Sequence, residues 1–245
     1  MIFTPFSVFT GATLELLAPD LLTVRFSRPT PVLSDAAFNG GWALVSAVAN
    51  HQMNADVIST AVEQTRYCAG LLARHGLTAD TPLQLTAAQV ARAGCHQVHG
   101  DRVRITACVS AGAKHNAVCA GDPPQYDESA ENEYIALPVG TINTAVFVEA
   151  RLAPAVFPHI FTVVAEAKAD LLRQRTVRSC YSSAFATGTG TDSTLVASDR
   201  SAIRTFSTAS THCWLGATIA QAVRAALEQA LHAEAAANPP GGGHG

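Results

Sequence analysis

Clusters of basic residues and long apolar runs are both missing from this sequence of 245 residues. Without a stretch rich in Lys and Arg, and with a net charge of −3, the chain lacks the electrostatic signature of a nucleic-acid-binding protein. No apolar run reaches the roughly 18 residues of a membrane-spanning helix. The first basic residue is Arg25, so the N-terminus lacks the charged start of a secretory signal. We therefore expect a cytoplasmic protein that binds neither nucleic acid nor a membrane.

Common metal, redox and catalytic motifs are missing as well. The 6 cysteines include no C-x-x-C pair, and the 9 histidines do not fall at metal-ligand spacing near them. Cys108 and Cys180 lie in or beside apolar stretches, which is typical of buried, reduced thiols. There is no G-x-S-x-G elbow, no C-G-x-C-W signature and no G-K-[ST] phosphate loop. A protein metal site, a standard Ser or Cys hydrolase and a P-loop enzyme are therefore not indicated.

The composition favours a single domain with a large core. Hydrophobic residues make up 48% of the chain and charged residues only 14%, against about 25% charged in an average soluble domain. This excess predicts a large core and also leaves room for an apolar cleft or a homo-oligomer interface. We expect one domain over residues 1–236, followed by a disordered Pro/Gly tail at 237–245.

Hydrophobic periodicity predicts an α+β fold. Strands are expected at 103–112, 140–150 and 184–198, with a β-hairpin at 13–26. Helices are expected at 61–75, 86–94, 154–172 and 212–236. The acidic, Pro-containing stretch 121–134 is expected to be a solvated loop. Because this order is not strict βαβ alternation, we expect a mixed, mostly antiparallel sheet covered by helices in a single layered domain.

The stretch "ATGTGTDS" at 186–193 is the most unusual local pattern. In an extended strand the hydroxyls of Thr187, Thr189 and Thr191 would share one face. The other face would carry only Gly188, Gly190 and Asp192, a bare backbone next to a carboxylate. Glycine within a strand often marks close approach by a ligand, although a bulge or tight helix packing is the alternative. It is not a dinucleotide fingerprint, because Ser193 stands where a third glycine would be needed.

Polar residues in three other segments are candidates for a site. Asn39 in "LSDAAFNGGW" could donate to a carbonyl or oxyanion, or could belong to an ordinary turn. Asn143 and Thr141 in "GTIN", like Asn116 and Asp122 in "HNAVCAGD", could bind a ligand or simply tie loops together.

Two helical segments complete the candidates. His212, at the start of the last expected helix, could act as a general base or be part of a capped helix start. Glu166 and Lys168 in "EAK" are two residues apart and do not face each other, which favours an ordinary helix surface.

Six segments together, in this order, resemble the adenosylcobinamide amidohydrolase (CbiZ) family: "LSDAAFNGG", "NAVCAGD", "GTINTAVFVEARL", "EAKADLL", "ATGTGTDS" and "STHCWLG". They span about residues 30–230. His115 and Cys119 depart from the pattern expected of the family, which bears on substrate range more than on reaction type.

The resemblance implies hydrolysis of one amide of adenosylcobinamide, giving adenosylcobyric acid and aminopropanol in corrinoid salvage. It implies no redox cofactor, because the cobalt belongs to the substrate. For this reaction we expect Asp192 or His212 as base, with Asn39, Asn143 and backbone N–H groups near Gly188 and Gly190 holding the oxyanion. A covalent route through Thr189 or Thr191 is the less favoured alternative, because the sequence identifies no base beside either threonine.

The substrate would contact a second set of residues, namely Gly188, Thr189, Gly190, Thr191, Asn116, Asp122 and Thr141. Two other functions stay open at this point. One is a non-catalytic corrinoid-binding protein, and the other is an unrelated small-molecule amidase.

Overall fold

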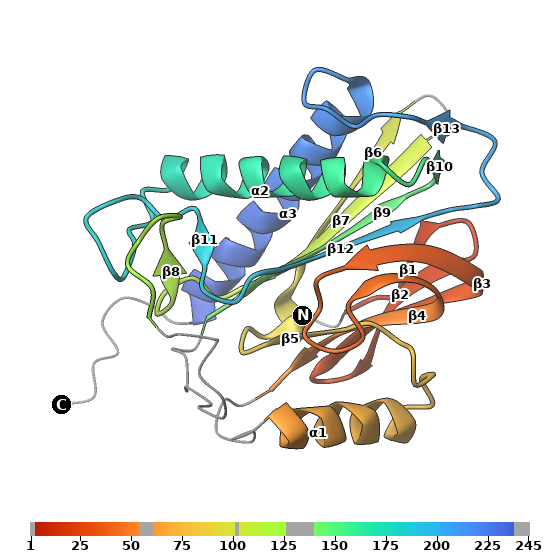
Figure 1. Cartoon of the computed structure of the whole chain (residues 1–245), viewed down its shortest axis with the longest axis horizontal. Coiled ribbons are helices and arrows are strands. Elements are labelled where there is room, and N and C mark those ends of the chain that lie inside the picture. Colours follow the sequence, from red (N-terminus) through yellow and green to blue (C-terminus); the bar gives the residue numbers. More distant parts are fainter. Residues whose placement is uncertain (1–2, 54–60, 101–102, 126–139, 238–245) are drawn as a thin grey trace.

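The computed structural model describes residues 3–53, 61–100, 103–125 and 140–237. Within these ranges it confirms the expected α+β class, with a large mixed, mostly antiparallel sheet and three α-helices packed on it (Figure 1). Much of the expected acidic loop and of the expected tail lies outside the described residues. No helix in the described ranges is long and apolar enough to cross a membrane.

The N-terminal part of the chain forms antiparallel strands. β2 (Ala12–Ala18) pairs with β3 (Leu21–Ser34), which confirms the predicted hairpin. β3 pairs in turn with β4 (Gly41–Gln52), a long strand that the sequence analysis did not predict. β1 (Phe6–Phe9) and β5 (Leu83–Thr86) extend this part of the sheet on either side.

The C-terminal part of the sheet contains two of the predicted strands almost unchanged. β7 (Val103–Ala111) and β9 (Ile142–Val148) pair antiparallel, and β6 (Gly94–Gly100) forms the edge beside β7. β12 (Ser193–Ser198) runs parallel to β9 and antiparallel to β3. It therefore joins the two parts into one sheet.

Helices cover the sheet in layers. α2 (Val156–Gln174) and α3 (Trp214–Ala237) confirm two predicted helices and lie on the same face of β7, β9 and β12 (Figure 1). They bury a core that includes Ile160, Leu172 and Ile219. The N-terminal strands cover the other face of these strands and enclose a second core with Phe147 and Leu195.

The third helix, α1 (Ala61–Arg74), covers the outer side of β3 and β4 and confirms the prediction for 61–75. It buries Cys68, Leu71 and Leu72 against this part of the sheet. Gly76 has a φ of +61°, the left-handed conformation that ends a helix and that glycine adopts without a Cβ penalty.

The prediction of a helix at 86–94 is wrong. Thr86 ends β5, and its hydroxyl accepts the N–H of Ala88 at 2.9 Å. A single 3-10 turn (Val90–Arg92) leads directly into β6 at Gly94. The Thr side chain thus closes a turn, which the same residue type does as readily as it caps a helix.

The strand expected at 184–198 is interrupted. Only Gly188–Thr189 (β11) and β12 form strands within it, and the chain turns between them. β11 pairs with β8 (Ala117–Val118) in a separate small ladder, and β10 (Arg151–Leu152) pairs with β13 (Thr205–Phe206) in another. The alternating faces assumed for residues 187–192 therefore do not exist as such.

The two cysteines expected to be buried differ in solvent exposure. Cys108 is 4% exposed, and burial raises the pKa of its thiol well above the ordinary value. Cys180 is exposed, so the prediction for this residue is wrong. Its N–H donates to the carbonyl of Ala117 in β8 at 2.8 Å. Cys180 therefore lies beside β8 and not within an apolar strand.

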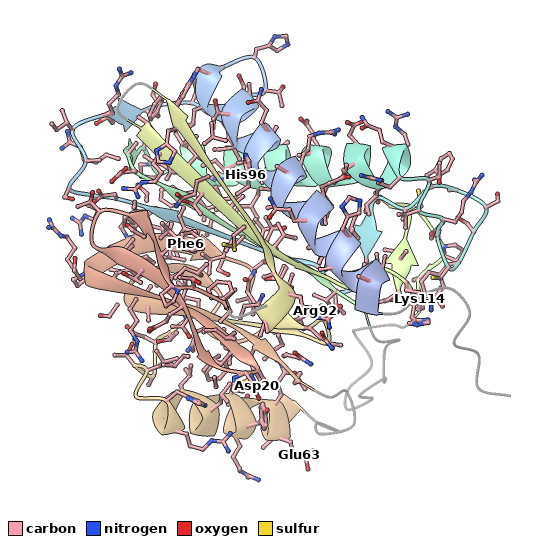
Figure 2. The ribbon with its side chains drawn as sticks, turned by 180° about the vertical axis from the view of Figure 1, so that it is seen from behind. Phe6, Asp20, Glu63, Arg92, His96 and Lys114 are labelled. Carbon is pink, nitrogen blue, oxygen red and sulfur yellow. The ribbon has the colours of Figure 1, made fainter. Side chains whose placement is uncertain are left out.

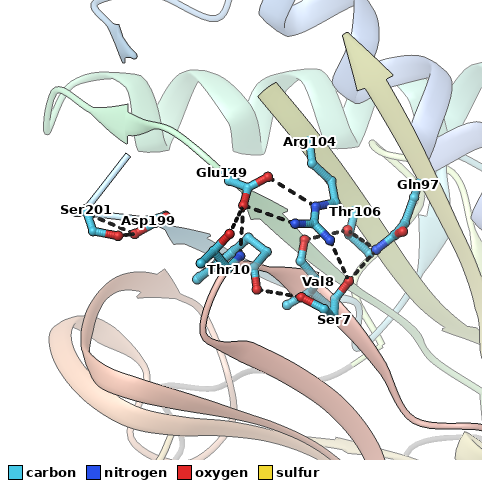
Figure 3. Close-up of polar contacts among 10 residues, drawn as sticks. Ser7, Val8, Thr10, Gln97, Arg104, Thr106, Glu149, Asp199 and Ser201 are labelled. Carbon is cyan, nitrogen blue, oxygen red and sulfur yellow. Dashed lines mark hydrogen bonds and ion pairs between the residues drawn. The ribbon is translucent and has the colours of Figure 1, made fainter. Parts of the chain in front are cut away.

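A polar cluster ties β1 and its turn to the sheet (Figure 3). Arg104 donates to both carboxylate oxygens of Glu149 at 3.1 Å, and the N–H and hydroxyl of Thr10 donate to Oε1 at 2.8 and 2.6 Å. Burial alone would raise the pKa of Glu149, but the hydrogen bonds from Arg104 and Thr10 outweigh it and lower this pKa.

Candidate active site

The turn between β11 and β12 brings a hydroxyl and a carboxylate together. Thr189 ends β11 and Asp192 immediately precedes β12, and the Thr189 hydroxyl donates a short hydrogen bond to Asp192 Oδ1. The same oxygen accepts the N–H of Ile142, the first residue of β9, at 3.0 Å. Donors from two segments therefore fix the orientation of the Asp192 carboxylate.

Lys168 joins this pair from α2. Its Nζ forms an ion pair with Asp192 Oδ2, and the two side chains are only 12% and 13% exposed. The neighbouring Ala167 and Leu171 anchor α2 in the core. Because the pair is largely removed from solvent, its charges are screened less than those of a surface ion pair.

The glycines of this turn leave space for the protein's own polar side chains. An added Cβ at Gly188 would lie 3.3 Å from Lys168 Nζ and 3.4 Å from Asp192 Cγ, and closer still to Oδ2. An added Cβ at Gly190 would lie 3.1 Å from Asn116 Oδ1. The groups that approach both glycines in this structure are therefore the protein's own side chains, Asp192, Lys168 and Asn116, and approach by a ligand stays a prediction.

A second hydrogen-bond network, centred on Asn116 and the Gly140 carbonyl, holds the turn between β11 and β12. The Asn116 amide donates to the Gly140 carbonyl at 3.0 Å and accepts from the Tyr181 hydroxyl at 3.1 Å. The Thr191 hydroxyl also reaches the Gly140 carbonyl, at 3.1 Å, and lies 2.5 Å from the Thr141 hydroxyl. Thr141 and Thr191 thus position the backbone around the carboxylate.

A pocket of about 700 Å³ lies over the cluster, within the range of roughly 300–1,000 Å³ typical of small-molecule sites. α2 contributes Lys168 and Glu166 to its wall. Six residues that the sequence analysis selected also line it, namely Gly188, Thr189, Gly190, Asp192, Asn116 and Asp122. The structure therefore brings together segments that are up to about 75 residues apart in the sequence.

Asp122 is a second carboxylate in the wall of this pocket. Its Oδ2 accepts from the Ser179 hydroxyl at 2.6 Å and from the Cys119 N–H at 2.8 Å. The hydrogen bonds from Ser179, Ser182 and the Cys119 N–H lower the pKa of Asp122. This side chain is therefore an anion at neutral pH.

The two asparagines expected to hold an oxyanion lie outside the lining of this pocket and use their amide hydrogens elsewhere. Asn39 donates to the carbonyls of Ala79 and Thr81 at 2.7 and 2.9 Å. Asn143 is buried and donates to Asn50 Oδ1 at 3.0 Å and to the Leu85 carbonyl at 2.9 Å. In this arrangement Asn39 ties its turn to the segment before β5, and Asn143 links β9 to β4 and β5.

His212 is not brought to Asp192. It is exposed and precedes α3, whereas Glu234, near the other end of α3, accepts from the N–H groups of Ala113 and Lys114. Figure 2 shows Lys114 beside that C-terminal end. At 1.5 Å per residue, the helix separates the two ends by roughly 30 Å.

Lys168 is the site residue that the sequence reasoning missed. The spacing of Glu166 and Lys168 correctly indicated that they do not face each other, but it could not show that Lys168 meets a carboxylate from another element. The available signal was its place in "EAKADLL", one of the segments on which the family resemblance rested.

A hydroxyl, a carboxylate and an ammonium group converging in a pocket can carry out nucleophilic attack on a carbonyl and hold the resulting charge. The fold and this site together define a class of α+β proteins with one large sheet and a polar cluster where α2 meets the turn before β12. The chain belongs to the adenosylcobinamide amidohydrolase family, CbiZ, whose profile matches residues 8–239.

Similarity to individual proteins is more distant. "Uncharacterized protein MJ1613" of Methanocaldococcus jannaschii is 26% identical over 221 residues, which cover 86% of this chain and 85% of that protein. The crystal structure of the PH0078 protein from Pyrococcus horikoshii OT3 matches with a TM-score of 0.40 and 12% identity, over 95% of this chain and 82% of the other. Neither match bears on the reaction.

Proposed function

We propose that this protein hydrolyses the amide that joins aminopropanol to the corrin side chain of adenosylcobinamide and releases adenosylcobyric acid. Membership of the family supports the substrate. The observation that carries the reaction type is the cluster of Thr189, Asp192 and Lys168 in the wall of a pocket of about 700 Å³. The cobalt enters only as part of the substrate.

The hydroxyl of Thr189 is the proposed nucleophile, because it already donates to a carboxylate that can accept its proton. As its oxygen bonds to the amide carbonyl carbon, the proton passes to Asp192. Cleavage of the C–N bond returns this proton to the leaving aminopropanol nitrogen. Water then hydrolyses the threonyl ester, which gives the free acid and restores the hydroxyl.

Lys168 is proposed to stabilise the oxyanion. Of its three N–H groups, the ion pair with Asp192 engages one. Two therefore remain to donate to the carbonyl oxygen of the substrate as negative charge develops on it. Preorganised donors of this kind contribute most where water is largely excluded, and the Lys168 side chain is only 12% exposed.

The direct test is to incubate the purified protein with adenosylcobinamide and to follow adenosylcobyric acid and aminopropanol by mass spectrometry. We expect turnover by the wild type and a loss of about 100-fold or more for Asp192→Asn, which cannot accept the proton. Asp80→Asn, at an exposed carboxylate outside the pocket lining, is the matched control.

The covalent step is tested at Thr189. Thr189→Ser retains a hydroxyl and should retain part of the turnover, whereas Thr189→Val should lose it. Added hydroxylamine should divert the ester to the hydroxamate of cobyric acid in the wild type. Turnover by Thr189→Val near the wild-type rate would mean that water attacks directly.

The same assay separates the two alternative functions. A corrinoid-binding protein would bind adenosylcobinamide and release no aminopropanol. An unrelated amidase would cleave simple amides without preference for the corrinoid. Either result would exclude the proposed reaction, whatever the effects of the variants.

A further inference from the structure

A second cleft, of about 440 Å³, lies at the opposite end of β12. Its lining includes Ser198, the last residue of β12, and Arg151 and Leu152, which form β10 directly after β9. It therefore opens at the carboxyl ends of the two parallel strands, the edge at which α/β sheets commonly bind ligands. We call it the Trp42 cleft, after the aromatic residue in its wall.

The wall of the Trp42 cleft exposes unusual apolar surface. Trp42 is 51% exposed and Leu44 is 50% exposed, although both belong to β4. The Trp42 ring meets the buried Phe157 ring edge to face, with 4.5 Å between centroids. Phe157 thus fixes the orientation of the indole from behind and leaves much of its surface open to a flat partner.

The rim of the Trp42 cleft is cationic. Arg151 and Arg200 line it, and its lining contains no Asp or Glu. Within the described part of the chain, neither guanidinium forms an ion pair, and Arg151 only reaches the Ile203 carbonyl at 3.4 Å. Two unpaired guanidinium groups on one cleft favour an anionic group, which each can bind through two parallel N–H donors.

The Trp42 cleft is separate from the candidate active site. Asp192 precedes β12 and Ser198 ends it, so the two sites lie at opposite ends of a strand. At about 3.3 Å per residue this separation is roughly 20 Å. A ligand in the Trp42 cleft therefore does not compete for the Lys168–Asp192 cluster.

We propose that the Trp42 cleft binds a molecule of mononucleotide size that combines a flat aromatic ring with a phosphate or carboxylate. The ring stacks on the open face of Trp42, and the anionic group lies between Arg151 and Arg200. This site is independent of the proposed amide hydrolysis, and its test does not require that activity.

Isothermal titration calorimetry with AMP, adenosine and inorganic phosphate tests both halves of the ligand. We expect AMP to bind more tightly than either adenosine or phosphate. Trp42→Ala and the double variant Arg151→Ala/Arg200→Ala should each weaken AMP binding by about tenfold or more. The matched controls are Arg66→Ala, an exposed arginine on α1, and Trp214→Phe, at the other tryptophan of the chain.

Circular dichroism and thermal melting of each variant verify that it folds. The proposal is overturned if AMP fails to bind the wild type, if adenosine or phosphate alone binds as tightly as AMP, or if the Trp42 and arginine variants bind AMP as the wild type does. It is also overturned if Asp192→Asn weakens AMP binding while Trp42→Ala does not, because AMP would then occupy the other pocket.

Discussion

At the scale of single residues, the Lys168–Asp192 pair is better explained by chemistry than by stability. Removing two charges from water costs free energy that their attraction often only balances, so a largely buried pair is weak support for stability. Here the pair is 12–13% exposed and also holds the Thr189 hydroxyl. A well-packed apolar pair could fill the same space without presenting charge to a pocket.

Replacing Lys168 tests this interpretation. We expect Lys168→Met to reduce turnover of adenosylcobinamide by about 100- to 1,000-fold, because it removes an oxyanion donor and a fixed charge. Lys114, the only other lysine of the chain, provides the matched control Lys114→Met. Equal turnover by the two variants, measured by product mass, would contradict the role assigned to Lys168.

Gly188→Ala should impair catalysis more than folding. The new Cβ would displace the carboxylate and ammonium groups that now lie against Gly188, and a displacement of about 1 Å at a reacting group can reduce the rate by about 100-fold. The control is Gly70→Ala in α1, where nothing lies within 4 Å of the added Cβ.

The two alanine variants should therefore diverge in two measurements. Gly70→Ala should keep full turnover and gain about 0.5–1 kcal/mol in the free energy of unfolding, since alanine favours the helix. For a chain of this size that gain raises Tm by about 1–4 °C. Full turnover by Gly188→Ala would show that the contacts of its backbone do not position the cluster.

At the scale of secondary-structure elements, α1 is joined to β4 by a buried histidine. His51 is 1% exposed, with Nδ1 3.0 Å from the Asp20 carbonyl and Nε2 2.7 Å from the Tyr67 hydroxyl. A carbonyl can only accept, so Nδ1 carries a proton, and in the neutral ring Nε2 accepts from the Tyr67 hydroxyl. The neutral ring therefore satisfies both hydrogen bonds.

The lowered pKa of His51 predicts acid sensitivity. Burial lowers the pKa of His51 and outweighs the Asp20 carbonyl and charge, which raise it, while His75 and Arg74 add to the lowering. Because the folded pKa is below the unfolded value of about 6.5, the contribution of His51 is complete above pH ~6.5 and is lost as the pH falls through the folded pKa.

Thermal melting between pH 7.5 and 5 measures the effect. We expect Tm of the wild type to fall across this range, and His51→Gln to melt lower at pH 7.5 but to change less with pH. His159→Gln, at an exposed position of α2, should follow the wild type. An equally steep fall in His51→Gln would place the sensitivity in other groups.

The elements that the sequence predicted are those whose hydrophobic pattern is regular. α2 and α3 have several turns of apolar spacing, and β7 and β9 have alternating β-branched residues, so local preference and burial agree. The segments 86–94 and 184–198 instead contain hydroxyl residues whose side chains form hydrogen bonds within turns. There the sequence pattern alone could not decide, because the partner groups come from distant strands.

The candidate site shows the same limit. Gly188, Thr189, Gly190 and Asp192 could be selected because the run is locally unusual. Lys168 could not, since its partner lies 24 residues further along the chain. The prediction for His212 used a valid local rule about helix N-termini. The length of α3, however, places this residue away from the cluster.

At the scale of the whole molecule, β12 organises the two proposed sites. It joins the N-terminal strands to the βαβ unit of β9, α2 and β12, and each of its ends borders one cleft. The cluster at the amino end is built from α2 and a turn, whereas the Trp42 cleft at the carboxyl end is built from β4 and β10. A ligand at either end therefore contacts parts of the chain that β12 connects.

Ligand-dependent melting can separate binding from turnover in this arrangement. At about 100 times its Kd, a ligand that binds only the folded state adds about 2.7 kcal/mol, which corresponds to a rise in Tm of about 5–11 °C for a chain of this size. We expect adenosylcobinamide to raise the Tm of Asp192→Asn by this amount while no aminopropanol appears. Retained binding with lost turnover would place Asp192 in the chemical step, because the carboxamide keeps the shape of the side chain and the hydrogen bond to its remaining oxygen. A variant that neither binds nor turns over would instead show that the Lys168–Asp192 pair shapes the pocket, and the role of proton acceptor would then have to pass to another group.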